Sequence, residues 1–156
     1  MKNIKNAKYN VVESYLLEIQ TSKKMYHASQ HQNLKMITIK EAEKNSSRAL
    51  KGHVWGSTDK SYCSTFCIPR SSKLGFRSGI YKGDKQRTIE VPKQYEHWLK
   101  RPCSIYEVDS TPFVREQNRT TEDWISDQDV KVLKEYKYRT ARECLEQNNI
   151  RVQIIS

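Results

Sequence analysis

The segment Lys23–Ile37, KKMYHASQHQNLKMI, decides how the fold of this chain is interpreted. A short apolar and aromatic run stops at a histidine, passes through Ala-Ser and enters a polar tract. Met25 and His27 alternate with Tyr26 and Ala28, which is the period of two of a β-strand. We therefore expect a first core strand that ends in Tyr-His-Ala-Ser. His27 is then either a strand histidine satisfied by the backbone or a group that faces a ligand.

Helical and strand patterns continue on both sides of this segment. Upstream, Val11–Ile19 places apolar residues at the spacing of an amphipathic helix, which predicts a helical extension over residues 1–22. A second short strand is expected within residues 33–43, and Arg70–Arg87, with its glycines and cations, is expected to be a mobile loop. We expect further strands at 53–58, 87–92, 102–109, 122–126, 130–136 and 150–155, and helices at 59–68, 93–99 and 141–147.

The chain is expected to form a single α+β domain. Its 156 residues suffice to bury a sizeable core, and it contains no internal repeat and no low-complexity linker. Residues 1–156 are therefore treated as one domain, with the core at 23–156. No stretch of 18 apolar residues is present, and the N-terminal segment carries Glu13 and Glu18 within its apolar part, so we expect neither a membrane span nor a signal peptide. A cytoplasmic location follows as an expectation.

The charge of the chain favours acidic partners. Lys and Arg outnumber Asp and Glu by 28 to 18, which gives a formal net charge of +10. Such a field attracts nucleic acid, phosphate-bearing molecules or acidic proteins. The cations are not concentrated in a long run, so a merely solubilising surface is the alternative.

The cysteines are expected to be reduced, buried side chains and to bind no metal. Cys63 and Cys67 are four residues apart, but the pairs of closely spaced cysteines that are typical of zinc sites are absent. A zinc-supported interaction domain built from Cys63, Cys67, Cys103 and His97 is a minor alternative.

Three segments, in order, resemble motifs of the ADP-ribosyltransferases, in particular the poly(ADP-ribose) polymerase and RNA 2'-phosphotransferase branch. The segment YHAS resembles the histidine strand, HVWGSTDKSYCSTFC resembles the second motif with its aromatic residue and following helix, and EDWIS resembles the glutamate strand. Two positions depart from the family pattern: Ala28 stands where Gly usually follows the histidine, and Trp55 replaces the usual Tyr. The resemblance implies a mixed or antiparallel split β-sheet with flanking helices, and NAD as substrate.

The resemblance also implies a role for particular residues. Glu122 would stabilise the oxocarbenium-like ribose as nicotinamide leaves, although Asp123, Glu116 and Glu107 are competing acids. His27 would bind the adenosine ribose, and its removal would abolish NAD binding at little cost in stability. Trp55 and Phe66 would bracket the nicotinamide ring, with burial in the core as the alternative for each. The full set of expected cofactor-binding residues is Tyr26, His27, Ser29, Trp55, Ser57 and Phe66.

A second class of function remains open. The net charge of +10, together with nine Tyr and three Trp, suits a nucleic-acid-binding protein without catalysis, because cations neutralise phosphates and aromatic rings stack on bases. The two hypotheses overlap, since the acceptor of ADP-ribose could be a polyanion or a nucleic acid as well as a protein.

Overall fold

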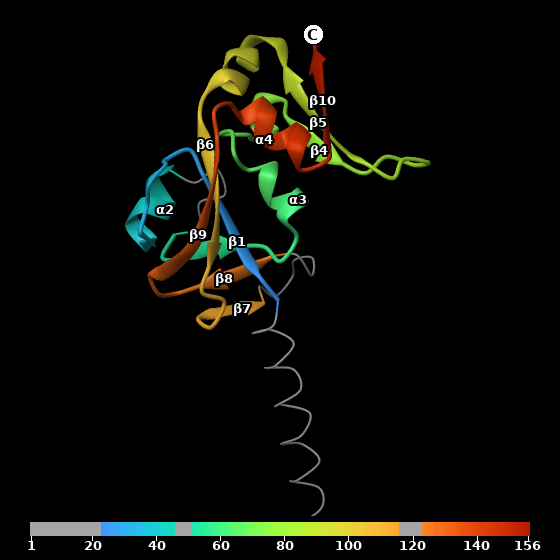
Figure 1. Cartoon of the computed structure of the whole chain (residues 1–156). Helices are drawn as coiled ribbons and strands as arrows, with labels where there is room; N and C mark the ends of the chain where they lie inside the picture. Colours follow the sequence, from blue (N-terminus) through green and yellow to red (C-terminus); the bar gives the residue numbers. More distant parts are fainter. Residues whose placement is uncertain (1–22, 46–50, 116–122) are drawn as a thin grey trace, which may run out of the picture.

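The computed structural model describes residues 23–45, 51–115 and 123–156. Within these ranges the chain forms a mixed α+β fold of three β-sheets connected by short helices (Figure 1). Every strand pair of the described residues is antiparallel except β5 with β10. The expected α+β class is thus confirmed.

The first sheet has four strands and contains the expected histidine strand. It pairs His27 with Tyr106 on the neighbouring strand. The register shifts between Glu107 and Val108, where a bulge leaves Leu133 exposed. In sheet order the strands are β1 (Met25–Ser29), β6 (Cys103–Val108), β9 (Val130–Tyr138) and β2 (Met36–Ile37).

The two faces of β1 bury different cores, as the alternation in KMYHAS predicts. Met25 packs in one cluster with Tyr106 and Phe113. Ala28 packs in a larger cluster with Ile105 and residues of the helices on the other face. Accordingly, α2 (Ile39–Asn45) lies on one side of this sheet, whereas α3 (Lys60–Ser64) and α4 (Ala141–Gln147) lie on the other (Figure 1).

The second sheet combines the C-terminal strand with the basic segment Arg70–Arg87. Its order is β10 (Ile150–Ile155), β5 (Arg87–Pro92) and β4 (Arg77–Gly79), and β4 and β5 form a hairpin that projects from the body (Figure 1). The segment also contains a short 3-10 helix, η1 (Ser72–Leu74). The prediction of a structureless loop is therefore wrong for these parts of the segment, because backbone pairing with β5 orders β4.

The third sheet brings the second and third sequence motifs together. Its order is β3 (Val54–Gly56), β8 (Trp124–Ser126) and β7 (Phe113–Arg115). Gly56 makes this arrangement possible, because a Cβ at that position would lie 2.8 Å from Phe113 Cε1 and 3.0 Å from Met25 Cγ. The strand motif HVWGST is thus packed tightly against the first sheet.

Short polar side chains fix where two of the helices begin. Asp59 caps α3, since its carboxylate accepts from the backbone N–H of Tyr62 at 3.1 Å. Thr140 caps α4 in the same way, accepting from the N–H of Glu143 at 3.1 Å. The sequence offers Thr58 or Asp59 as the cap of the first helix and Thr140 with Glu143 as a capping-box pattern for the second, and the structure uses Asp59 and Thr140. The stretch 93–99 is helical as expected, but forms a 3-10 helix, η2 (Lys93–Lys100).

Two helix boundaries differ from the sequence prediction. Within residues 33–43 the expected strand is short, and the chain turns into α2, whose first turn is capped by Thr38 through the N–H of Glu41 at 3.0 Å. The helix expected over 59–68 ends at Ser64, well before Pro69, because the N–H groups of Thr65, Phe66 and Cys67 bond carbonyls three residues back in tight turns.

Two sequence predictions fall on residues that the structure does not describe. They are the helical extension over residues 1–22 and the position of Glu122. Across the described ranges, no helix has both the length and the apolar character that a membrane crossing requires.

Candidate functional site

The three sequence motifs meet where β3 crosses β1. The backbones of Tyr26 and Ser57 exchange two hydrogen bonds, of 2.8 and 2.9 Å. Nδ1 of His27 lies 2.7 Å from the carbonyl oxygen of Trp55, and Nε1 of Trp55 donates to Oδ1 of Asp123 at 2.6 Å. Hydrogen bonds therefore join the histidine strand, the Trp-Gly-Ser segment and the acid that precedes β8.

The bond to Trp55 determines the protonation of His27. A carbonyl oxygen can only accept, so Nδ1 carries the hydrogen, and Nε2 of the neutral ring is an acceptor. Burial lowers the pKa of His27, although the bond to the Trp55 carbonyl acts in the opposite direction. The residue is only 1% exposed. This environment agrees with the alternative of a strand histidine satisfied by the backbone.

Trp55 and Phe66 contact each other directly and do not bracket an open space. Their ring centroids are 4.6 Å apart with the planes at 60°, and Tyr62 packs edge-on against both. Trp55 is 1% and Phe66 4% exposed. The predicted stacking of nicotinamide between these rings is not supported, because no gap for a third ring separates them; both occupy the core.

The two predicted serines are engaged in local turns. Ser29 Oγ accepts from the N–H of His31 at 3.0 Å, and Ser57 Oγ accepts from the N–H of Asp59 at 3.0 Å. Both residues are buried. Their hydroxyls therefore hold the chain where β1 and β3 end. Tyr26 is half-buried, and burial raises the pKa of its phenol.

Asp123 is the acid that the described structure places at this site. It is 2% exposed and accepts from Trp55 Nε1. Glu122, the predicted catalytic residue, directly precedes it in the chain but lies outside the described residues. Glu107, another of the competing acids, lies on β6, opposite Tyr26 of β1.

A row of cations on aromatic rings, which sequence reasoning missed, lies beside this site. Lys60 Nζ lies 3.6 Å from the centroid of the Tyr136 ring, where Lys134 also approaches to 4.7 Å. The guanidinium of Arg87 lies 4.8 Å from the Tyr62 ring. We call these five side chains the cation–ring face. They come from α3, β5 and β9, so no local spacing in the sequence connects them.

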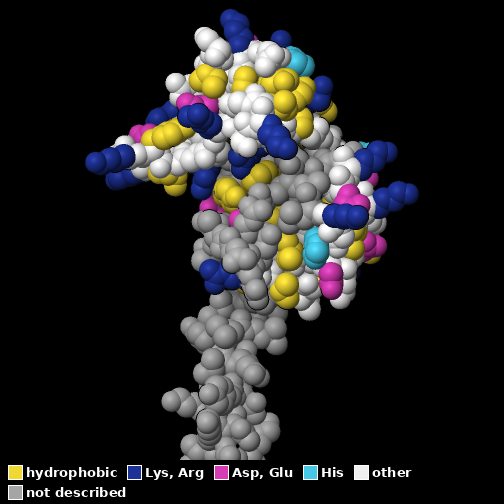
Figure 2. Space-filling model, turned by 180° about the vertical axis from the view of Figure 1, so that it is seen from behind, with side chains coloured by type: hydrophobic (Ala, Val, Ile, Leu, Met, Phe, Trp, Pro, Cys, Tyr) yellow, Lys and Arg dark blue, Asp and Glu magenta, His cyan; other side chains and the backbone are white. Residues whose placement is uncertain are grey.

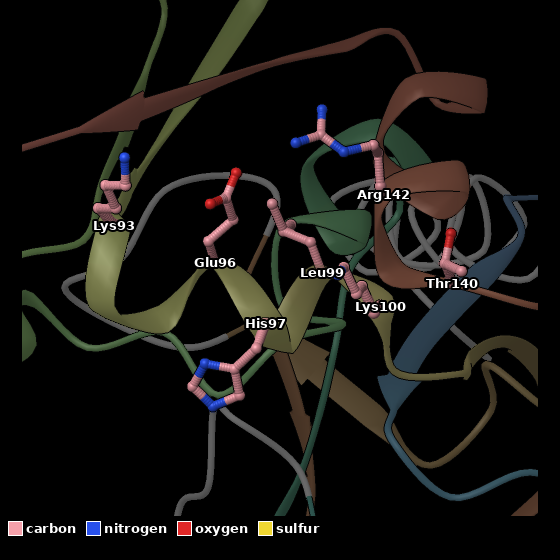
Figure 3. A pocket seen from close by; sticks show the side chains of 7 residues that line it. All are labelled: Lys93, Glu96, His97, Leu99, Lys100, Thr140 and Arg142. Atoms are coloured by element: carbon pink, nitrogen blue, oxygen red, sulfur yellow. The ribbon is translucent and has the colours of Figure 1, made fainter.

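A surface depression of about 600 Å³ lies between η2 and α4 (Figure 3). Its lining includes Lys93, Lys100 and Arg142, which would favour an anion. However, Arg142 is paired with Glu146 at 3.3 Å, and the His97 ring points away from Glu96. All the lining residues except Leu99 are partly or fully exposed. The depression contains none of the predicted site residues.

The projecting hairpin carries Lys and Arg side chains to its end, whereas other cations are scattered over the visible face (Figure 2). Lys73, Arg77 and Lys82 in this segment are all exposed. The segment is therefore an extended basic arm rather than part of a compact basic patch.

The four cysteines are buried and free, as expected. The zinc alternative with His97 is not supported, because His97 is exposed on η2. Three sulfurs nevertheless gather, those of Cys67, Cys103 and Cys144, whose ligand atoms all lie within 4.8 Å of one another.

Comparison with other proteins gives no assignment: no family model matches the chain, and neither the curated proteins nor the solved structures include a match.

Proposed function

We propose that this chain transfers ADP-ribose from NAD to an acceptor, through an oxocarbenium-like ribose. The observation that carries the proposal is the convergence of the three motif segments. His27 and Trp55 are 28 residues apart and Trp55 and Asp123 are 68 residues apart, yet hydrogen bonds join them in one region. A dinucleotide site requires such a meeting of distant segments. The split-sheet fold of the ADP-ribosyltransferases is part of the same proposal, supported by the bridge between β1 and β3.

The state of His27 suits recognition of a ribose. Because Nδ1 donates to the Trp55 carbonyl, Nε2 of the neutral ring is left as an acceptor for a ribose hydroxyl. The low exposure of His27 means that neighbouring groups must move before a ligand reaches Nε2. Ligand binding would therefore be coupled to a local opening of the site.

The acid next to Asp123 supplies the catalytic charge in this proposal. A carboxylate close to the ribose stabilises the positive charge that develops as nicotinamide leaves. Asp123 is already bonded to Trp55, which makes it a positioning residue for the Trp-Gly-Ser segment. Glu122 is therefore assigned the electrostatic role.

Nicotinamide release from NAD tests the proposal. The full chain is incubated with NAD, and free nicotinamide is measured by chromatography, while NAD binding is measured by isothermal titration calorimetry. Glu122→Gln keeps the shape but removes the charge, so we expect release to fall by about 10²–10³-fold with binding largely retained. Glu116→Gln removes one negative charge at a competing acid of the sequence, and as the control it should leave the rate unchanged.

Two results would contradict the proposal. The absence of both NAD binding and nicotinamide release in the unmodified protein would remove its basis. Equal losses of activity in Glu116→Gln and Glu122→Gln would show that net charge, rather than a placed carboxylate, controls the rate.

The cation–ring face favours a second candidate function, the binding of single-stranded nucleic acid. Lys60, Lys134 and Arg87 lie against the partly exposed rings of Tyr136 and Tyr62. Aromatic rings beside cations can stack bases while the cations neutralise phosphates. The same face could hold a nucleic-acid acceptor of ADP-ribose.

Fluorescence anisotropy with a labelled single-stranded oligonucleotide tests this second candidate. Lys60→Ala combined with Arg87→Ala should weaken binding and reduce the salt dependence by about 0.7 per lost phosphate contact. Lys40→Ala, an exposed cation on α2 across the first sheet, is the control and should change little. Equal weakening by the control would indicate attraction by net charge alone.

A further inference from the structure

Three cysteine sulfurs form a compact group inside the larger core, which we call the three-thiol cluster. The sulfurs of Cys67, Cys103 and Cys144 all lie within 4.8 Å of one another. The residues are 1%, 0% and 0% exposed. Cys67 follows α3, Cys103 begins β6, and Cys144 lies in α4. The cluster therefore connects three elements that are separate in the sequence, and it involves none of the residues assigned to the proposed function.

The surroundings of the cluster are almost entirely apolar. The polar contacts are weak: the thiol of Cys67 donates to the carbonyl of Ala141 at 3.9 Å, and Nδ2 of Asn148 donates to the sulfur of Cys144 at 3.9 Å. Ile105 and Leu145 belong to the same buried cluster. Among the described residues, no imidazole or carboxylate joins the three sulfurs as a further donor.

The spacing of the sulfurs suits one ion with three ligands. Three sulfurs bound at about 2.3 Å to a single ion lie roughly 3.4 Å from one another when the ion is trigonal pyramidal, and roughly 4.0 Å when it is trigonal planar. The observed limit of 4.8 Å is wider than both values, so each sulfur must move inward by up to about 0.8 Å to complete a pyramidal coordination. Zinc in structural sites almost always takes four protein ligands, and the cluster provides three.

Charge decides between the ions that accept three thiolates. Three thiolates around Cu(I) carry two net negative charges, and around a divalent ion they carry one, whereas around a trivalent ion the group is neutral. A buried charge without a partner is strongly unfavourable, and within the part of the chain that the structure describes the hydrogen bonds of this cluster include no cation. A neutral complex is the form that such a core tolerates best.

We propose that Cys67, Cys103 and Cys144 form a binding site for trivalent arsenic and for trivalent thiophilic ions of the same trigonal geometry. Arsenous acid, As(OH)₃, reacts with three thiols to give the tris-thiolate complex and three molecules of water. Three As–O bonds break and three As–S bonds form, and each thiol proton leaves with a hydroxide. Neither an oxidant nor a net change in charge is required.

Because the three sulfurs are buried, we expect arsenite to bind to them slowly. Because the sulfurs are enclosed, arsenite reaches them only when α4 or the segment after α3 opens locally. The rate of binding should therefore become independent of arsenite at high concentration. Once bound, the ion ties α4 to β6, and the melting temperature should rise with arsenite concentration.

The test uses the full chain, reduced and freed of small thiols, with sodium arsenite as the probe. After gel filtration we expect one arsenic per chain by elemental analysis, and X-ray absorption should show three sulfurs and no oxygen around it. Failure to retain arsenic, or a shell of two sulfurs and one oxygen, would overturn the proposal.

Substitutions separate the cluster from the remaining cysteine. Cys103→Ala and Cys144→Ala should each lose retained arsenic, whereas Cys63→Ala should keep one per chain. Cys63 is the matched control because it is equally buried but lies outside the three-thiol cluster. Loss of the retained arsenic in Cys63→Ala, or tighter retention of zinc than of arsenic by the unmodified protein, would indicate a site of four sulfurs and refute the three-sulfur arsenic site. The absorption measurement on the unmodified protein decides the matter even if a variant fails to fold.

Discussion

Replacing His27 by Asn should remove a specific loss of stability at acidic pH. The folded protein holds the ring neutral, since burial lowers its pKa below the usual value of 6.5. The unfolded state therefore binds more protons below about pH 6.5, so stability falls as the pH falls through this value. Asn places an amide nitrogen near the position of Nδ1 and can still donate to the Trp55 carbonyl, but it does not titrate.

The size of the effect follows from the linkage. If His27 stays neutral in the folded state, lowering the pH from 7.5 to 5.5 costs the unmodified protein about 1.4 kcal/mol through this residue. The Asn variant should lack this contribution, while starting roughly 1–2 kcal/mol less stable because ring contacts are lost. His27→Ala should be less stable still, by about 1–3 kcal/mol, because it leaves the Trp55 carbonyl buried without its donor. The sequence-based expectation that this change spares stability is therefore revised.

Urea unfolding, followed by far-UV circular dichroism at pH 5.5, 6.5 and 7.5, provides the free energies of unfolding. The relevant quantity is the difference in pH dependence between the unmodified protein and His27→Asn, because the two proteins share every other titratable group. If the two proteins lose the same stability on acidification, the buried, neutral state of His27 is refuted.

Two further predictions concern the packing that supports the site. Gly56→Ala should lower the free energy of unfolding by about 1–3 kcal/mol, because the added Cβ would lie 2.8 Å from Phe113 Cε1. Gly79→Ala is the control and should be near neutral, because no atom lies within 4 Å of its added Cβ. Similar urea midpoints for the two variants would contradict the close packing at Gly56. Thr140→Ala should lower the free energy of unfolding by about 0.5–2 kcal/mol through loss of the α4 cap, whereas Thr140→Ser, which keeps a hydroxyl, should retain most of the stability. A urea midpoint for Thr140→Ala equal to that of the unmodified protein would show that the cap contributes nothing.

Much of the secondary structure could be predicted because it depends on near neighbours. The alternation in KMYHAS predicted β1 and the direction of its side chains, and Asp59 and Thr140 marked the starts of α3 and α4. Within the segment Arg70–Arg87 the part that forms β4 was mispredicted as a loop, because β4 is stabilised by pairing with β5 rather than by its own composition.

The candidate site was only partly predictable. The sequence suggested that the segments with His27, Trp55 and Glu122 belong together. Hydrogen bonds join His27 to Trp55 and Trp55 to Asp123, a competing acid next to Glu122 in the chain, whereas Glu122 itself lies outside the described residues. The sequence did not reveal that Trp55 and Phe66 contact each other. Aromatic residues recur at the same spacing whether they face the core or a ligand, so the spacing cannot distinguish the two.

The α+β class, the position of most strands and helix caps, and the strongly basic charge follow from the amino-acid sequence alone, since each depends on composition or on residues a few positions apart. The pairing of the strands, the contact of Lys60 in α3 with Tyr136 in β9, and the gathering of three cysteines in one buried cluster became visible only in the folded chain. These contacts depend on strand register and on the packing of α3 and α4 against the sheet. Both are set by the burial of the whole core, which no local pattern encodes.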